Sequence, residues 1–241
     1  LTLHYLSVAP EALIGSAVTG GLVGLDADAS EIYRRTFPRV IAKNREFRER
    51  TPHLSGRIAR IVDILANTDV RLPDGDRLTV RRFQTLGFGF GMGPGFDRTH
   101  WILDEAFVDE AETRLSDTFI ESVAHTTSFA DGPLYAALQE SIYGPGPSAW
   151  AAQRERDTRP EFREDADTLL FTGEMVFPWM FEEMRELRGF RAGVEALAKR
   201  EWPISLYDSD RLAANEVPVE AVIYLDDMYV DAGLSRETAD R

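Results

Sequence analysis

The stretch Glu216–Asp231, EVPVEAVIYLDDMYVD, decides the expected fold because a strand pattern in it runs into a pair of acids. Its apolar, largely β-branched run is typical of a strand buried on both faces of a parallel sheet. Asp226 and Asp227 follow directly, and ligands of open α/β sheets lie beyond the carboxyl ends of the strands. These carboxylates are therefore functional candidates by position. They could equally open a loop or cap the helix expected to start near Leu234.

A second apolar run, Ala12–Thr19, predicts another buried strand because Pro10 and Gly20-Gly21 bound it. Leu1–Pro10 predicts a helix before that strand. The sequence between the two strands is mostly helical in pattern, with helices expected over Ile32–Arg50, Leu54–Asn67, Thr79–Leu86, Phe96–Asp109, Pro133–Tyr143 and Arg188–Arg200. This order predicts a helical insertion between two strands of a parallel sheet.

Local signals mark several boundaries inside the insertion. Asp28 and Glu31 have capping-box spacing, and Pro38 is expected to kink or split the helix that follows. Thr79 is a candidate helix cap, and Pro73–Gly75 is a predicted turn. The glycine-rich run Gly87–Gly95 lacks both GxGxxG and GK[ST] spacing, so we expect close packing and a turn there rather than a phosphate loop.

Composition excludes several functions. The 241 residues carry a formal net charge of −14, which argues against nucleic acid or an anionic membrane as a partner. The chain has no cysteine, which rules out thiolate catalysis and disulfides and fits a cytoplasmic protein. No histidine and acid cluster has metal-ligand spacing, so neither a metal nor another cofactor is expected.

One acid stands within an apolar and aromatic stretch, LLFTGEMVFPWMFEEMRE, Leu169–Glu186. Burying Glu174 unpaired among these neighbours would be costly, so it should face water, meet a cation or titrate at a raised pH. Glu140 similarly lies among apolar neighbours in the helix predicted over Pro133–Tyr143.

Taken in order, five segments resemble the proline iminopeptidase (prolyl aminopeptidase) family of α/β-hydrolases. They are YLSVAPEALIGSAVTGGL (5–22), VRLPDGDRLTVRRFQTLG (70–87), HTTSFADGPLYAALQESIY (125–143), LLFTGEMVFPWMFE (169–182) and RLAANEVPVEAVIYLDDMYVD (211–231). The resemblance rests on this succession rather than on any one short motif. It implies an α/β fold, an α/β-hydrolase fold only partly contained in this chain, with a large helical cap inserted between two parallel core strands. Residues 1–25 and 201–241 would belong to the core, and residues 26–200 to the cap.

The resemblance also implies a serine exopeptidase that releases an N-terminal proline, or a similar residue, through a Ser/Asp/His triad. Asp227 takes the place of the triad acid, with Asp226 as its competing neighbour. Cap carboxylates would hold the free amino group of the peptide substrate, Glu174 as the first candidate and Glu140 as the second. Glu140 could instead be an ordinary helix acid. An apolar pocket for the proline ring could include Phe171, Phe177 and Trp179, which could also simply fill the cap core.

The chain departs from the family pattern in lacking GxSxG, and none of its four histidines follows Asp227. We therefore expect the serine and the histidine to come from the remaining N- and C-terminal segments of the same protein, which this chain would lack as a fragment. Two alternatives stay open. One is another α/β-hydrolase, an esterase or an epoxide hydrolase, and the other is a non-catalytic binding protein on a hydrolase scaffold.

Overall fold

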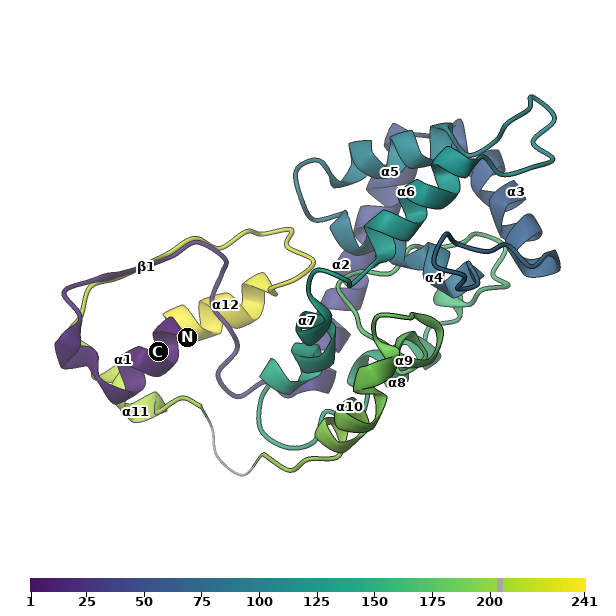
Figure 1. The fold of residues 1–241 in the computed structure, drawn as a ribbon. Helices are drawn as coiled ribbons and strands as arrows, with labels where there is room; N and C mark the ends of the chain where they lie inside the picture. The colour runs from purple at the N-terminus through teal and green to yellow at the C-terminus, as the bar shows by residue number, and fades with distance from the viewer. Residues whose placement is uncertain (203–205) are drawn as a thin grey trace.

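A computed structural model describes residues 1–202 and 206–241 of the chain. Figure 1 shows a smaller lobe, which contains both termini, beside a larger helical body. The smaller lobe is formed by α1 (Thr2–Val8), η1 (Pro10–Ala12), β1 (Ser16–Val18), α11 (Ser209–Ala213), β2 (Val219–Ala221) and α12 (Ala232–Ala239). Two segments that are far apart in the sequence thus build one lobe. The expected core segment 201–241 includes residues 203–205, which lie outside the described residues.

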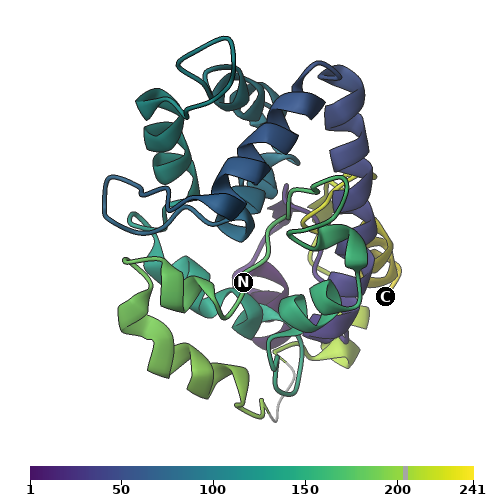
Figure 2. The same ribbon diagram turned by 90° about the vertical axis from the view of Figure 1, so that its right-hand side faces the viewer.

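The helical body contains the elements from α2 to α10. In chain order they are α2 (Ala29–Arg50), α3 (Leu54–Asn67), α4 (Val80–Gln84), η2 (Thr85–Gly89), α5 (Gly95–Asp104), α6 (Asp117–Thr127), α7 (Pro133–Leu138), η3 (Gln139–Ile142), α8 (Ala151–Asp157), η4 (Pro160–Phe162), α9 (Met180–Glu183), η5 (Arg188–Phe190) and α10 (Arg191–Ala198). Figure 2 shows these helices arranged around a common interior, with the smaller lobe behind them. The expected helical insertion is therefore present.

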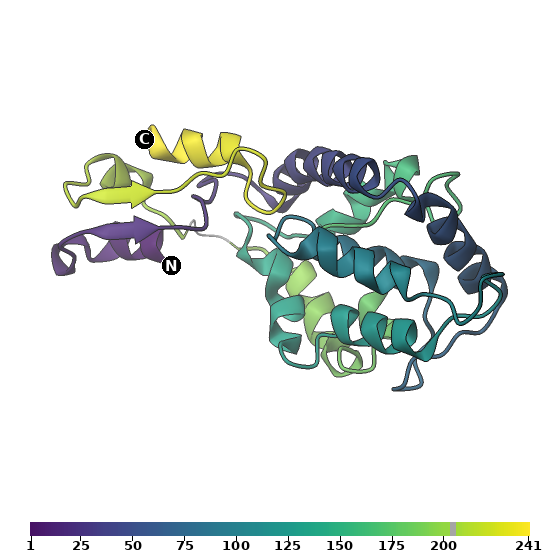
Figure 3. The ribbon, with the colours of Figure 1, turned by 90° about the horizontal axis from the view of Figure 1, so that it is seen from above.

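The two strands pair in parallel, as the sequence predicts for strands separated by a long insertion. Ser16 pairs with Val219 and Val18 with Ala221, and Figure 3 shows the strands side by side next to α12. The expectation that both strands are buried is wrong for the described residues. Val222 is 45% exposed and Tyr224 is 52% exposed. Within the described part of the chain, the sheet has only these two strands, and all three residues of β2 are exposed.

Capping side chains start the helices where the sequence predicts. The Asp28 carboxylate accepts a hydrogen bond from the Glu31 N–H at α2, and the Thr79 hydroxyl accepts one from the Arg82 N–H at α4. Pro38 lies inside α2 without splitting it. The cap of α12 is Asp231, whose Oδ1 accepts a hydrogen bond from the Leu234 N–H at 3.0 Å. Capping this helix is therefore not the role of Asp226 or Asp227.

A phenylalanine cluster fills the centre of the body, where Phe171 lies 5.4 Å from Phe83 and 5.5 Å from Phe90 between ring centroids. The glycine-rich run packs against it as expected. A Cβ on Gly87 would lie 2.5 Å from the Phe171 Cβ and 2.5 Å from the Thr172 carbonyl oxygen, so the approach requires glycine. Among the described residues, none of the helices combines the length and the apolar character that a membrane span needs.

Candidate functional site

A cavity of about 460 Å³ lies where the smaller lobe meets the helical body. Its wall combines residues from α1, β1, the segment after β1 and the loop after β2 with Ile142, Tyr143 and Glu174 of the body. Most of these groups are apolar, and Glu174 and Asp231 are the acids among them. The sequence-predicted acid Glu174 therefore faces a cavity to which both lobes contribute.

Glu174 is held by side chains from the helical segment Pro133–Ile142. The Tyr135 hydroxyl donates a hydrogen bond to Glu174 Oε1, and Gln139 also bonds to the carboxylate. The pKa of Glu174 is raised, mainly because the carboxylate is buried and also because Asp227 is negatively charged. The two hydrogen bonds lower the pKa, but they do not cancel the effect of burial. Glu174 is thus a partly desolvated carboxylate that would gain strongly from a cation beside it.

Asp227 lies in the loop after β2, with its carboxylate fixed by the backbone of the same loop. Its Oδ1 accepts hydrogen bonds from the N–H groups of Tyr229, at 2.7 Å, and Val230, at 3.2 Å. Within the described residues, no hydrogen bond reaches Oδ2. Asp226 differs, because its side chain is 86% exposed and lies 3.6 Å from the guanidinium of Arg39. The structure therefore distinguishes the two neighbouring acids, and only Asp227 is oriented by its surroundings.

Tyrosines complete this site, and the sequence-based search did not find them. Burial and the charges of Glu174 and Asp227 raise the pKa of Tyr229 to about 12, against a hydrogen bond with Gly91 that lowers it. Burial and the charge of Glu174 also raise the pKa values of Tyr135 and Tyr143. Tyr135, Gln139 and Tyr143 recur every four residues in the sequence, which is the spacing of one helix face and the signal that could have indicated them.

The carboxylate of Glu140 is hydrogen-bonded by backbone N–H groups and by the Ser148 side chain. Its side chain is buried, and its two oxygens accept hydrogen bonds from the N–H groups of Ala151, at 3.1 Å, and Ala152, at 2.8 Å. These residues begin α8, so the carboxylate satisfies N–H groups that have no partner inside the helix. Burial raises the pKa of Glu140, and these bonds lower it. Glu140 does not line the cavity that contains Glu174.

The three aromatic candidates lie in the core of the body rather than on the cavity wall. Phe171 is 1% exposed in the phenylalanine cluster. Phe177 and Trp179 stack with centroids 5.9 Å apart, and the guanidinium of Arg81 lies over the Trp179 ring. None of the three lines the cavity that contains Glu174. They stabilise the body through packing.

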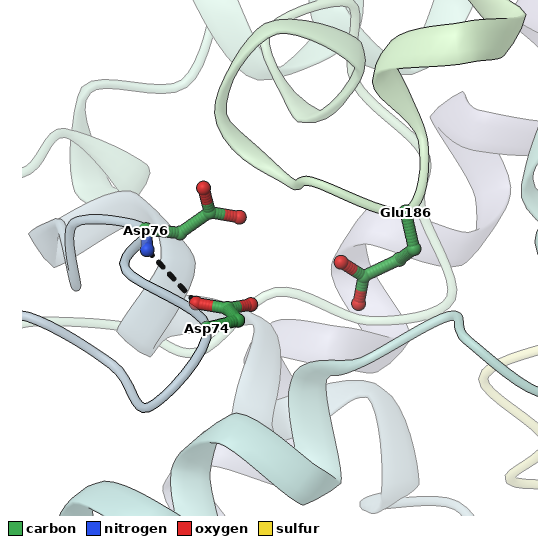
Figure 4. A group of neighbouring side chains, drawn as sticks. All are labelled: Asp74, Asp76 and Glu186. Carbon is green, nitrogen blue, oxygen red and sulfur yellow. Dashed lines mark hydrogen bonds between the residues drawn. The ribbon is translucent and has the colours of Figure 1, made fainter.

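A separate group of acids comprises Asp74 and Asp76, between α3 and α4, and Glu186, between α9 and η5 (Figure 4). Its potential ligand oxygens lie within 4.8 Å of one another. Asp76 forms ion pairs with Arg188 and with the buried Arg82, and Glu186 accepts a hydrogen bond from the Ser128 hydroxyl. The two arginines already compensate Asp76, and their guanidinium groups would repel a cation placed among the three acids.

The site has two chemical capabilities. The carboxylate of Glu174 can bind a cation, and the carboxylate of Asp227 can orient a neighbouring group that accepts a proton. Glu174 offers a carboxylate with tyrosine neighbours in a partly apolar cavity. Asp227 offers an oriented carboxylate, and its negative charge raises the pKa of Glu174. Glu174 belongs to the helical body and Asp227 to the loop after β2, and the two carboxylates interact electrostatically.

Comparison with known proteins finds two relatives that align with almost all of this chain. It is 40% identical over 240 residues to a proline iminopeptidase of Aeromonas sobria, an alignment that covers 98% of this chain and 56% of that protein. It is 30% identical over 242 residues to the proline iminopeptidase aneH of Aspergillus aculeatus, which covers 99% of this chain and 54% of that protein. No protein-family model matches the chain. The chain spans about half the length of the curated relatives it matches. Along almost its whole length, this chain is homologous to proteins of the proline iminopeptidase family.

Proposed function

We propose that the protein containing this chain is a serine exopeptidase that releases an N-terminal proline, or a similar residue, from peptides. The observation that carries the proposal is the meeting of Glu174 and Asp227 at one junction, in a chain that aligns along almost all of its length with proteins named proline iminopeptidase. The parallel strands with a helical body between them support an α/β-hydrolase core, of which residues 1–25 and 201–241 are parts, with residues 26–200 as its cap.

Asp227 is the proposed triad acid. Its Oδ1 is held by two backbone N–H groups, which leaves Oδ2 to accept a hydrogen bond from the imidazole of a histidine. That bond fixes the histidine tautomer and stabilises the imidazolium formed when the serine hydroxyl loses its proton. The serine and the histidine would come from the remaining N- and C-terminal segments of the same protein.

Glu174 is the proposed acceptor for the substrate's free amino group. An ammonium brought into the cavity would offset the charge that burial and Asp227 make costly on Glu174. A blocked N-terminus carries no positive charge, so it would not form this ion pair with Glu174. The substrate is therefore a peptide with a free N-terminus, and specificity for that terminus comes from charge.

The test compares proline-naphthylamide with its N-acetylated form in the full-length protein. Wild type should cleave only the free amine. Glu174→Gln should raise KM for the free amine at least tenfold, as expected for the loss of a charge-assisted hydrogen bond. Glu121→Gln is the matched control, because Glu121 lies exposed on α6. Equal cleavage of free and acetylated substrates would refute the proposal.

A further inference from the structure

The loop that carries Asp227 is docked into the helical body rather than projecting freely from β2. Met228, the next residue, is 2% exposed and belongs to the apolar core of the body. It packs beside Gly173, where an added Cβ would lie 2.9 Å from the Met228 Cε. The chain thus leaves the smaller lobe at the acid and enters the body one residue later.

Tyr229 makes the second contact with the body, on the glycine-rich run. Its hydroxyl donates to the Phe88 carbonyl oxygen at 2.8 Å and accepts from the Gly91 N–H at 3.2 Å. Its ring rests on Gly91, where an added Cβ would lie 2.9 Å from the Tyr229 Cζ and 2.8 Å from the Met228 Cγ. Glycine at position 91 therefore leaves the space that Tyr229 occupies.

Two arginines of α2 hold the flanks of the same loop. Arg39 lies 3.6 Å from Asp226 before the acid, and Arg35 lies 3.3 Å from Asp231 after it. Arg35 and Arg39 are one helical turn apart, so both arginines contact the loop from the same face of α2. The Arg39–Asp226 pair is exposed and adds little energy, whereas Asp231 is largely buried beside Arg35.

We propose that Tyr229, seated over Gly91, is a positioning residue that fixes Asp227 relative to Glu174. The N–H groups of Tyr229 and Val230 orient the Asp227 carboxylate, so the position of Tyr229 sets the position of the acid. Gly91 and Glu174 both belong to the helical body. The contact of Tyr229 therefore ties the acid to the body that carries the amine-binding site. The catalytic meaning of this contact rests on the function proposed above.

Hydrogen exchange tests the contact without any need for activity. In Gly91→Ala, the new methyl group displaces Tyr229, so the N–H groups of Tyr229 and Val230 should exchange at least about tenfold faster. Gly93→Ala is the matched control from the same run, because a Cβ there meets nothing within 4 Å. Its exchange should match wild type within about twofold. Tyr229→Phe keeps the ring and loses both hydroxyl bonds, and it should give a smaller increase in the same two groups.

Kinetics in the full-length protein test the positioning role. Gly91→Ala and Tyr229→Phe should lower kcat for proline-naphthylamide by about tenfold or more with little change in KM, because the affected group is the acid. Gly93→Ala should leave both constants unchanged. A rise in KM at constant kcat would show that Tyr229 contacts substrate instead, and this would overturn the proposal. Unchanged exchange at Tyr229 and Val230 in both variants would overturn it as well. A wild-type protein without cleavage would refute the proposed function, while the exchange result would still decide whether Gly91 and Tyr229 hold the loop.

Discussion

Replacing Glu140 separates a structural carboxylate from an amine-binding one. Its oxygens accept hydrogen bonds from the N–H groups of Ala151 and Ala152, two residues with no exposed surface. A buried N–H left without a partner costs about 1–3 kcal/mol. Glu140→Ala removes both acceptors, so we expect the free energy of unfolding to fall by about 2–6 kcal/mol.

Glu140→Gln should have a smaller effect, because the amide keeps one acceptor oxygen for one of the two N–H groups. The expected loss is about 1–3 kcal/mol. Burial raises the pKa of Glu140, which means that the charge itself is costly in the folded protein. Removing the charge offsets part of the free energy lost with the hydrogen bond. We therefore expect the glutamine variant to lie near the lower end of this range.

Urea unfolding followed by circular dichroism measures these differences, with Glu121→Gln on the exposed surface of α6 as the control. That control should stay within about 0.5 kcal/mol of wild type. In the full-length protein, Glu140→Gln should leave KM for proline-naphthylamide unchanged. The reasoning is refuted if Glu140→Gln unfolds like the control but raises KM for the free amine, because Glu140 would then bind substrate.

Three further changes test the site and the core. Phe171→Ala should lower the free energy of unfolding by about 3–5 kcal/mol in urea titrations, since the ring lies in the phenylalanine core; a stable variant with altered substrate preference would return Phe171 to the substrate pocket. KM for a free-amine substrate should rise as the pH falls through the raised pKa of Glu174, because protonation removes the charge that binds the ammonium; kinetics of Glu174→Gln should lack this dependence, and its persistence would assign the titration to another group. Asp227→Asn should lower kcat by about 10⁴ while Asp226→Asn stays near wild type; the reverse result in the same assay would make Asp226 the triad acid.

Some of the helices were predictable because their signals are local, whereas α6 and α8 were not predicted and α5 ends at Asp104, before the expected Asp109. The helix Leu54–Asn67 has the expected bounds, since its apolar residues keep one helical face and the next residues break the pattern. Asp28 and Thr79 cap helices by accepting hydrogen bonds from the N–H groups three residues ahead. Because the partners are so near in sequence, the capping pattern can be recognised from the sequence alone. The parallel pairing also followed from the order of elements.

The burial of the strands and the partners of the acids depended on contacts that are distant in sequence. Val222 lies in an apolar, β-branched run of the kind found in buried strands, yet it is exposed in the described part of the chain. Glu140 and Glu174 both looked like acids in apolar helices or loops, and only the fold shows that one bonds to α8 and the other to Tyr135. Tyr229 contacts Gly91 across most of the chain, a relation that no local pattern encodes.

The pairing of Ser16 with Val219 also constrains the order in which the chain can fold. Bringing the two strands together from an unfolded chain would close a loop containing the whole helical body, and the entropic cost of closure grows with the length of the loop. The contacts inside the body are nearer in sequence and form without that closure. Once the body is compact, α2 and the segment after α10 emerge from one folded unit, and the effective loop is much shorter. We therefore expect refolding in which helical circular dichroism recovers first and protection of the β1 and β2 amide groups follows as a slower phase.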